Sequence, residues 1–133
     1  MKNLTLNLLI SHPSMDPGLI TDQLALKPQL TQRNGDQIVT PKGKVAGGLY
    51  KWTKWRYFIE LENSDLLNDE IHSLITILYV KRQFFNEIRL EDGKSIMYIN
   101  HSCQEHLNLV LDPEVLEKLC KMSMSFGVEI FND

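Results

Sequence analysis

The sequence predicts an α+β fold in which a mixed, mainly antiparallel sheet of about six strands carries two to four helices on one face. Two observations predict it. Segments with apolar residues at alternating positions recur from one end of the chain to the other, as in strands with one buried face. Between them lie segments with apolar residues at three- and four-residue steps, and two of these open with Asp-Pro. A chain of 133 residues is expected to form a single domain, residues 1–133.

The first quarter of the chain predicts a strand followed by a helix. Residues 4–10 have an apolar side chain at every second position, which is the pattern of a half-buried strand. Asp16 and Pro17 suit the N-cap and the first position of a helix. The apolar side of this helix is expected to consist of Leu19, Ile20 and Leu24.

A hairpin and a loop are predicted next. Residues 30–33 and 37–39 are interpreted as two short strands that pair with each other across a turn at Asn34-Gly35. Residues 40–48 contain glycines, a proline and lysines, and are predicted to be a loop.

The stretch from Gly47 to Leu61 holds both tryptophans and is interpreted as one strand. One face would be core, packed against a helical stripe from Ile71 to Leu78. This face would consist of Trp55, Tyr57, Ile59 and Leu61. The opposite face mixes rings with charges, and would consist of Tyr50, Trp52, Lys54, Arg56, Phe58 and Glu60.

The periodicity of residues 65–90 predicts one long helix, or two helices joined by a bend near Lys81-Arg82. Residues 95–102 are apolar on both faces, which is typical of an interior strand. Residues 107–111 alternate and predict another strand.

Asp112-Pro113 repeats the helix-opening chemistry of Asp16-Pro17. The apolar stripe of this last helix is expected to bury Cys120, and Gly127 is placed as its C-terminal cap. Residues 128–131 predict a final short strand. The predicted order of elements is β-α-β-β-α-β-β-α-β.

Composition points to a cytoplasmic protein with no membrane association. Two cysteines are too few for a disulfide framework. The N-terminal residues alternate where a secretory signal would be continuously apolar, and no apolar run approaches the roughly 20 residues of a membrane span.

No catalytic residue, metal ligand or cofactor is assigned. His101 to His106 contain zinc-ligand types, but no CxxC or second ligand pair accompanies them. Cys103 with His101 or His106 lacks any identifiable oxyanion hole. The segment Gly43 to Gly48 lacks the order of a phosphate-binding loop. Whether the chain is an enzyme is left open, with a non-enzymatic role preferred.

A basic and aromatic region is the strongest functional signal. Residues 27–56 contain seven basic side chains and one acid, a charge of +6, so the remaining residues carry −9 of the total of −3. Trp and Arg dominate interface energies, and a basic patch attracts an acidic partner. The alternative is that the fold itself neutralises or covers these residues. The predicted binding residues are Trp52, Lys54, Arg56, Arg33, Lys42 and Lys44.

Several motifs together resemble a known family. They are the N-terminal strand with Asp16-Pro17, the Gly35-Asp36 turn, the strand at Tyr50-Lys51-Trp52, Leu109 to Leu116, and Gly127 to Ile130. Over nearly the whole chain they resemble the bacterial domain-of-unknown-function family 4279. The resemblance implies a stand-alone bacterial α+β domain and carries no activity or catalytic residues. Small domains of this kind sometimes act as immunity or accessory proteins.

The sequence therefore leads to two functional hypotheses. The first is an uncharacterised bacterial intracellular domain that acts as a non-enzymatic protein-interaction module and binds an acidic protein or a second copy of itself. The second is a small-molecule, nucleotide or nucleic-acid binding domain. The net charge of −3 and the absence of an RNA-binding aromatic motif count against nucleic acid.

Overall fold

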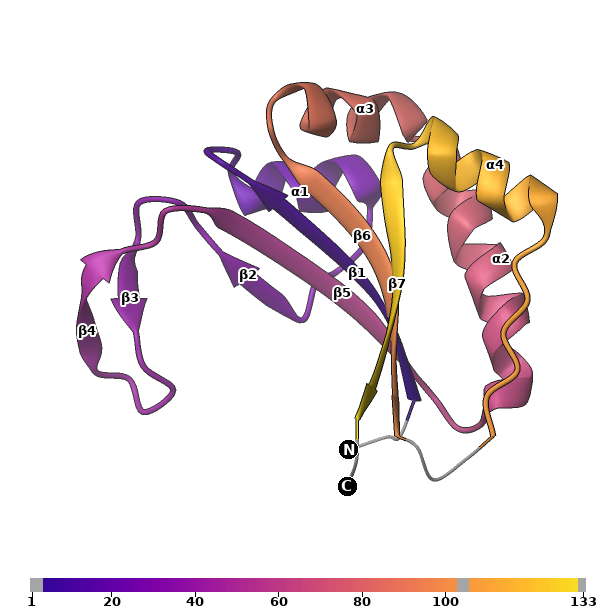
Figure 1. Cartoon of the computed structure of the whole chain (residues 1–133). Coiled ribbons are helices and arrows are strands. Elements are labelled where there is room, and N and C mark those ends of the chain that lie inside the picture. Colours follow the sequence, from indigo (N-terminus) through magenta and orange to yellow (C-terminus); the bar gives the residue numbers. More distant parts are fainter. Residues whose placement is uncertain (1–3, 103–105, 132–133) are drawn as a thin grey trace.

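A computed structural model of the whole chain describes residues 4–102 and 106–131 (Figure 1). Its main sheet has five strands in the order β2-β5-β1-β6-β7. All neighbours are antiparallel except β6 and β7, which are parallel. The α+β class and the mixed, mainly antiparallel sheet are confirmed, with five strands where about six were expected. The strands are β1 (Leu4–His12), β2 (Leu30–Gln32), β5 (Thr53–Leu61), β6 (Lys94–Ser102) and β7 (Met124–Phe131).

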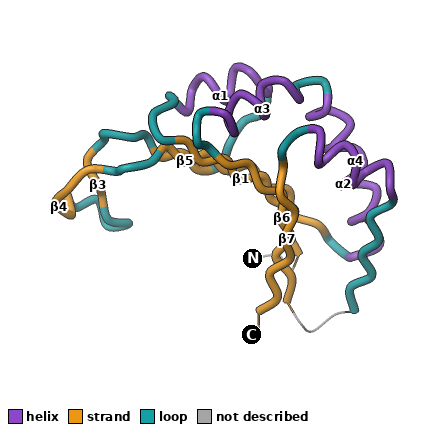
Figure 2. Tube along the Cα trace, turned by 45° about the horizontal axis from the view of Figure 1, so that its top comes forward, coloured by secondary structure: helices purple, strands orange, loops and turns teal. Residues whose placement is uncertain are grey.

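Four helices in the described part of the chain lie on one side of this sheet (Figure 2). The long helical segment is two helices, since α2 ends at Tyr79 and α3 starts at Arg82, as the alternative with a bend predicted. A single 3₁₀ turn, Ser64–Leu66, precedes α2. The helices are α1 (Pro17–Leu24), α2 (Leu67–Tyr79), α3 (Arg82–Leu90) and α4 (Pro113–Lys121).

The two Asp-Pro helix starts are confirmed in atomic detail. A carboxylate oxygen of Asp16 accepts a hydrogen bond from the Gly18 backbone N–H at 2.8 Å. Asp112 accepts one from the Val115 N–H at 2.9 Å. In both helices proline takes the first turn, where its missing N–H costs no hydrogen bond. On α1, Ile20 and Leu24 are buried as expected, whereas Leu19 is exposed.

The core lies between the sheet and the helices. The central strand β1 buries its alternate residues Leu4, Leu6, Leu8 and Ile10 there, and Trp55 of β5 is fully buried beside Ile10. The predicted core face of β5 is confirmed for Trp55 and Leu61, which are buried, and Tyr57 and Ile59 pack partly buried against the core. The Trp55 indole N–H donates to the Thr21 hydroxyl at 3.0 Å, so α1 contacts this tryptophan. The buried side chains of α2 belong to the same core.

The opposite surface of the sheet has no helix on it, as Figure 2 shows. We call it the helix-free face. Residues paired across antiparallel strands point to the same side of a sheet. The pairs on this face include Leu9 with Arg56 and Asn7 with both Phe58 and Tyr98.

The predicted pairing of residues 30–33 with 37–39 is wrong. The strand β3 (Gln37–Val39) pairs with β4 (Val45–Leu49), and β2 pairs with β5. Residues 40–48 are thus only partly a loop. The sequence did not indicate β4 because this strand contains Gly47 and Gly48. They lie at positive φ angles of 74° and 87°, which a strand of ordinary residues does not adopt.

The predicted strand at residues 107–111 is also wrong. This segment runs as an irregular chain beside α2. The Asn68 side chain holds it, since its amide nitrogen donates to the Asn108 carbonyl at 3.4 Å and its oxygen accepts from the Val110 N–H at 3.3 Å. Leu107, Leu109 and Leu111 pack partly buried against the core. Their alternation therefore reflects packing of an extended segment outside the sheet.

Two expectations about the last helix are wrong. The helix α4 ends at Lys121, and Ser123 takes the left-handed conformation (φ 52°) that was assigned to Gly127. Gly127 lies inside β7 and pairs with Tyr98. Cys120 is exposed, because α4 buries the side containing Val115 and Leu119.

Candidate interaction surface

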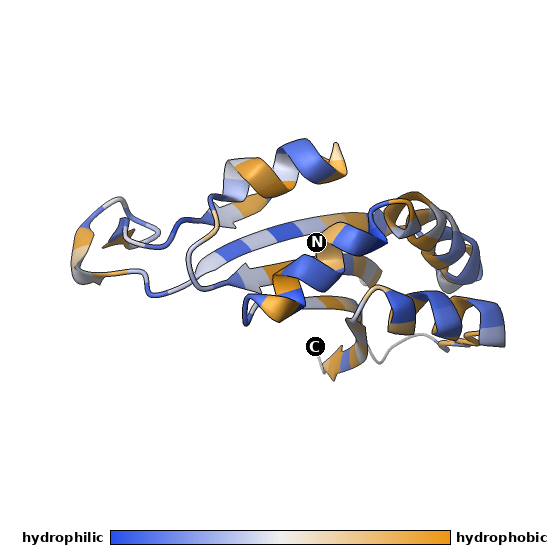
Figure 3. Ribbon diagram, turned by 90° about the horizontal axis from the view of Figure 1, so that it is seen from above, coloured by the Kyte–Doolittle hydropathy of each residue, from blue (hydrophilic) through white to orange (hydrophobic). Residues whose placement is uncertain are grey.

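The β3–β4 hairpin projects away from the helices and from the main sheet (Figure 1). All five residues of β4 are exposed. Three large apolar side chains on the hairpin are 48–60% exposed, and Figure 3 shows hydrophobic residues here, at the end of the molecule away from the helices. These side chains are Val39, Val45 and Leu49.

Backbone hydrogen bonds at the tip order the loop that carries two lysines. The Thr40 N–H donates to the Lys44 carbonyl at 2.8 Å, and the Lys44 N–H donates to the Thr40 hydroxyl at 3.1 Å. The Gly43 N–H donates to the Thr40 carbonyl at 2.8 Å. Lys42 and Lys44 are exposed at this tip.

The base of the hairpin is also closed by hydrogen bonds. The Gly35 N–H donates to the Tyr50 carbonyl, and the Tyr50 N–H donates to the Asp36 carbonyl, both at 2.9 Å. The Asn34-Gly35 turn signal thus marks the base of this hairpin and not a turn between β2 and β3.

Trp52 lies just before β5, which begins at Thr53 and not at Gly47 as expected. Its carbonyl accepts a hydrogen bond from the Gln32 side chain at 2.9 Å. The Lys51 carbonyl likewise accepts one from the Asn34 side chain at 2.7 Å. The backbone is therefore held in place while the Trp52 side chain stays 42% exposed, in contrast to the fully buried Trp55.

Lys54 is exposed on the helix-free face, at the end of β5 next to Trp52. Within the described residues, the side chains of Lys42, Lys44 and Lys54 form no ion pair. Their charges are available to an acidic ligand.

Arg56 and Arg33 are engaged within the fold. The Arg56 guanidinium donates to Asn7 Oδ1 at 2.9 and 3.1 Å and lies over the Phe58 ring, 5.0 Å from its centroid. Arg33 donates to the Asp16 carboxylate at 2.6 Å. The structure thus places four of the six predicted residues, Trp52, Lys54, Lys42 and Lys44, on the hairpin or at its base, and gives the other two internal partners.

Sequence reasoning missed the apolar part of this surface. Val39 was assigned to a short strand, Val45 to the loop of residues 40–48 and Leu49 to the strand expected from Gly47 to Leu61, so their common exposure on one hairpin was not predicted. The sequence feature that could have indicated this surface is the pair of apolar residues Val45 and Leu49 on either side of Gly47-Gly48, in a segment too short to reach the core.

No metal centre forms within residues 4–102 and 106–131, where no three His, Cys, Asp or Glu side chains converge. Residues 103–105 of the predicted metal-like cluster lie outside the described chain. His12 contacts Glu91 at 2.8 Å, a two-residue contact between β1 and the end of α3. None of the described helices combines the length and the apolar character needed to cross a bilayer.

Residues 2–132 match the family model described as "Domain of unknown function (DUF4279)". The chain belongs to this family. Membership of DUF4279 agrees with the resemblance found in the motifs, and it assigns no activity. Comparison with curated proteins gives no significant match, and neither does comparison with solved structures.

Proposed function

We propose that this DUF4279 chain is a non-enzymatic interaction domain that binds an acidic protein partner through the β3–β4 hairpin and the adjoining residues Trp52 and Lys54. The observation that carries the proposal is the exposure of apolar side chains on a projecting hairpin whose lysines form no ion pair with any described residue.

The apolar side chains provide the source of affinity. Exposed apolar residues grouped on one element, with polar residues around them, are typical of protein-binding surfaces. Burying an exposed tryptophan and its aliphatic neighbours in a partner removes apolar area from water, at about 25 cal/mol per Å². Tryptophan is also among the residues that most often dominate binding energy. Trp52 is therefore the expected centre of the contact.

The lysines determine the kind of partner. The hairpin and its base, residues 35–54, carry Lys42, Lys44, Lys51 and Lys54 against Asp36, a net charge of +3. Such a surface repels a second copy of itself and attracts an acidic segment, and it accelerates the encounter at low salt. An acidic partner is favoured over a homodimer for this reason.

Affinity capture from the source cells, with quantitative mass spectrometry, tests the proposal. The variant Lys42→Glu/Lys44→Glu changes the net charge from −3 to −7, because each substitution removes one positive charge and adds one negative charge. The control Lys27→Glu/Lys81→Glu makes the same change at exposed lysines outside the hairpin. We expect the acidic protein retained by the wild type to be retained by the control and lost from the hairpin variant. Equal retention by the hairpin variant would refute the proposal.

Trp52→Ala provides a second test that leaves charge unchanged. Because the ring is exposed and its backbone is held by neighbouring side chains, this variant keeps its fold. We expect binding of the captured protein to weaken at least tenfold, as for truncation of an interface hot spot.

A further inference from the structure

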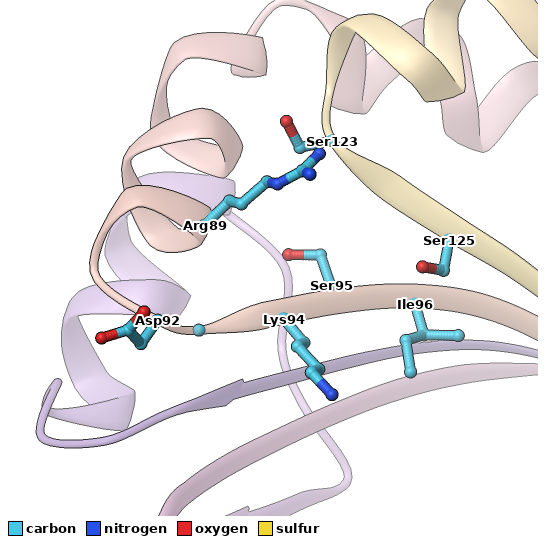
Figure 4. Close-up of a pocket in the computed structure, with 8 residues that line it drawn as sticks. Arg89, Asp92, Lys94, Ser95, Ile96, Ser123 and Ser125 are labelled. Carbon is cyan, nitrogen blue, oxygen red and sulfur yellow. The ribbon is translucent and has the colours of Figure 1, made fainter.

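A cavity of about 500 Å³ opens at the end of the main sheet where β6 and β7 begin (Figure 4). It lies between the last turn of α3, the start of β6 and the turn that joins α4 to β7. Its size falls within the range of small-molecule sites. It is separate from the hairpin surface, because β1 lies between β5 and β6 in the sheet.

Ser95 is the unusual residue of this cavity. It is only 4% exposed, and its hydroxyl has no hydrogen-bond partner in the described structure. A buried hydroxyl without a partner is costly, and such groups are rare in folded proteins. A ligand in the cavity that accepts a hydrogen bond from Ser95 would remove this cost.

Arg89 supplies a positive charge above Ser95. Its side chain extends from α3 across the cavity toward Ser123, as Figure 4 shows, and it forms no ion pair with any described residue. A guanidinium presents a planar fork of N–H donors that matches a carboxylate or a phosphate. Its position in the last turn of α3 also suits the negative end of the helix dipole.

The serines on the β7 side complete the lining. The Ser123 hydroxyl donates to Asn86 Oδ1 of α3 at 2.5 Å, which ties the turn before β7 to α3. Ser125 also lines the cavity and is exposed, but it pairs with Ile96, so its side chain lies on the opposite face of the sheet from Ser95. The Ser95 hydroxyl and the Arg89 guanidinium are therefore the two donors that lie on the same side of the sheet.

Charge at the mouth of the cavity favours an anion. Asp92 is its one acidic lining residue, and Figure 4 shows its carboxylate directed away from Arg89 and Ser95. Lys94 also lines the cavity, from the other side of the β6 strand. The lining residues thus carry two positive charges against one negative charge.

We propose that this cavity binds a small molecule through a phosphate or carboxylate group, which Arg89 and Ser95 hold. The cavity is several times larger than a single inorganic anion, so it has room for the remainder of the ligand. The site is independent of the proposed partner surface on the hairpin.

Titration of the isotope-labelled protein with inorganic phosphate and, separately, with citrate, followed by NMR, tests this site. We expect saturable shifts of the Ser95 amide and of the Arg89 Nε–H, and the tighter of the two probes identifies the anionic group. Arg89→Gln is expected to weaken binding about tenfold, as loss of a charge-assisted hydrogen-bond pair does. Ser95→Ala is expected to weaken binding and leave the melting temperature unchanged or higher, because it removes an unsatisfied buried hydroxyl.

Lys81→Gln, at the opposite end of α3, is the matched control for loss of one positive charge and should bind as the wild type does. Lys42→Glu/Lys44→Glu should also leave anion binding unchanged, which separates this site from the hairpin. Absence of saturable shifts with both probes, or equal weakening by Lys81→Gln and Arg89→Gln, would overturn the proposal.

Discussion

The Arg56 guanidinium donates two hydrogen bonds to Oδ1 of Asn7, at 2.9 and 3.1 Å, across the helix-free face of the sheet. Asn7 is fully buried although no helix lies over it. Its amide nitrogen donates to the Thr5 hydroxyl at 3.0 Å and the Tyr98 carbonyl at 3.3 Å. This polar network links three strands, so Arg56 is a structural residue of the sheet.

Asn7→Ala is expected to destabilise the fold. The substitution removes the acceptor of both Arg56 hydrogen bonds, and hydrogen bonds to a charged group contribute about 1.5–3 kcal/mol. Urea unfolding should show a loss of that size in the free energy of unfolding. Lys54→Ala, on the same face with no described partner, serves as the control and should change it by less than about 0.5 kcal/mol. Equal effects of the two variants would contradict a structural role for Arg56.

The two tryptophans should be distinguishable by fluorescence. With Trp52→Phe, the remaining Trp55 is fully buried, so we expect blue-shifted emission that acrylamide quenches weakly. With Trp55→Phe, the exposed Trp52 should emit at longer wavelength and be quenched readily. Trp55→Phe should also cost roughly 1–3 kcal/mol, since it removes the hydrogen bond to Thr21 and leaves unfilled volume. Similar quenching of both variants would contradict the burial described.

Gly93 is expected to tolerate no side chain. A Cβ at this position would lie 2.6 Å from Ile88 Cγ2 and 2.8 Å from the Ser11 carbonyl oxygen, closer than packed atoms approach. Gly93→Ala should therefore lower stability by about 1–3 kcal/mol, as overpacking does. Gly127→Ala is the control, because its Cβ would meet Tyr98 Cβ at an ordinary 3.7 Å. Thermal melts of both proteins would show the difference, and an unchanged Gly93→Ala protein would refute the packing at the α3–β6 turn.

The pair Glu117–Lys121 on α4 predicts a pH effect. A hydrogen bond from Lys121 to Glu117, at 2.8 Å, together with the attraction of opposite charges, lowers the pKa of Glu117 from its ordinary value of 4.5. The stabilisation is thus present above pH 4.5 and is lost as the pH falls through the lowered pKa. An NMR titration of the Glu117 side chain should show its pKa rising toward the ordinary value in Lys121→Gln. The same pKa in both proteins would show that the pair does not form in solution.

The sequence correctly predicted the helix starts, which depend on local chemistry, and the strand β1, which has one buried face. The two Asp-Pro starts are local, since the capping carboxylate and the proline act within the first turn. The alternation of β1 follows from a strand with one face in the core. The same rule failed at residues 107–111, because an extended segment packed against α2 alternates in the same way.

Which strands pair, and which charged side chains find a partner within the fold, depends on residues far apart in the chain. Lys54 and Arg56 look alike in the sequence, but Asn7, which lies 49 residues before Arg56, engages only the arginine. Arg33 meets Asp16 across 17 residues in the same way. The sequence shows that basic and aromatic residues are concentrated between Lys27 and Arg56, and the fold shows which of these cations have partners among the described residues.

Hydrogen exchange of the complex with the captured partner tests the hairpin surface most directly. The amides of β4 lie on an exposed hairpin, so they should exchange quickly in the free protein and markedly more slowly in the complex. The hairpin tip around Lys42 and Lys44 should be protected with them. Slowed exchange confined to other segments, such as the β6–β7 pair, with unchanged exchange in β4, would contradict the proposed surface.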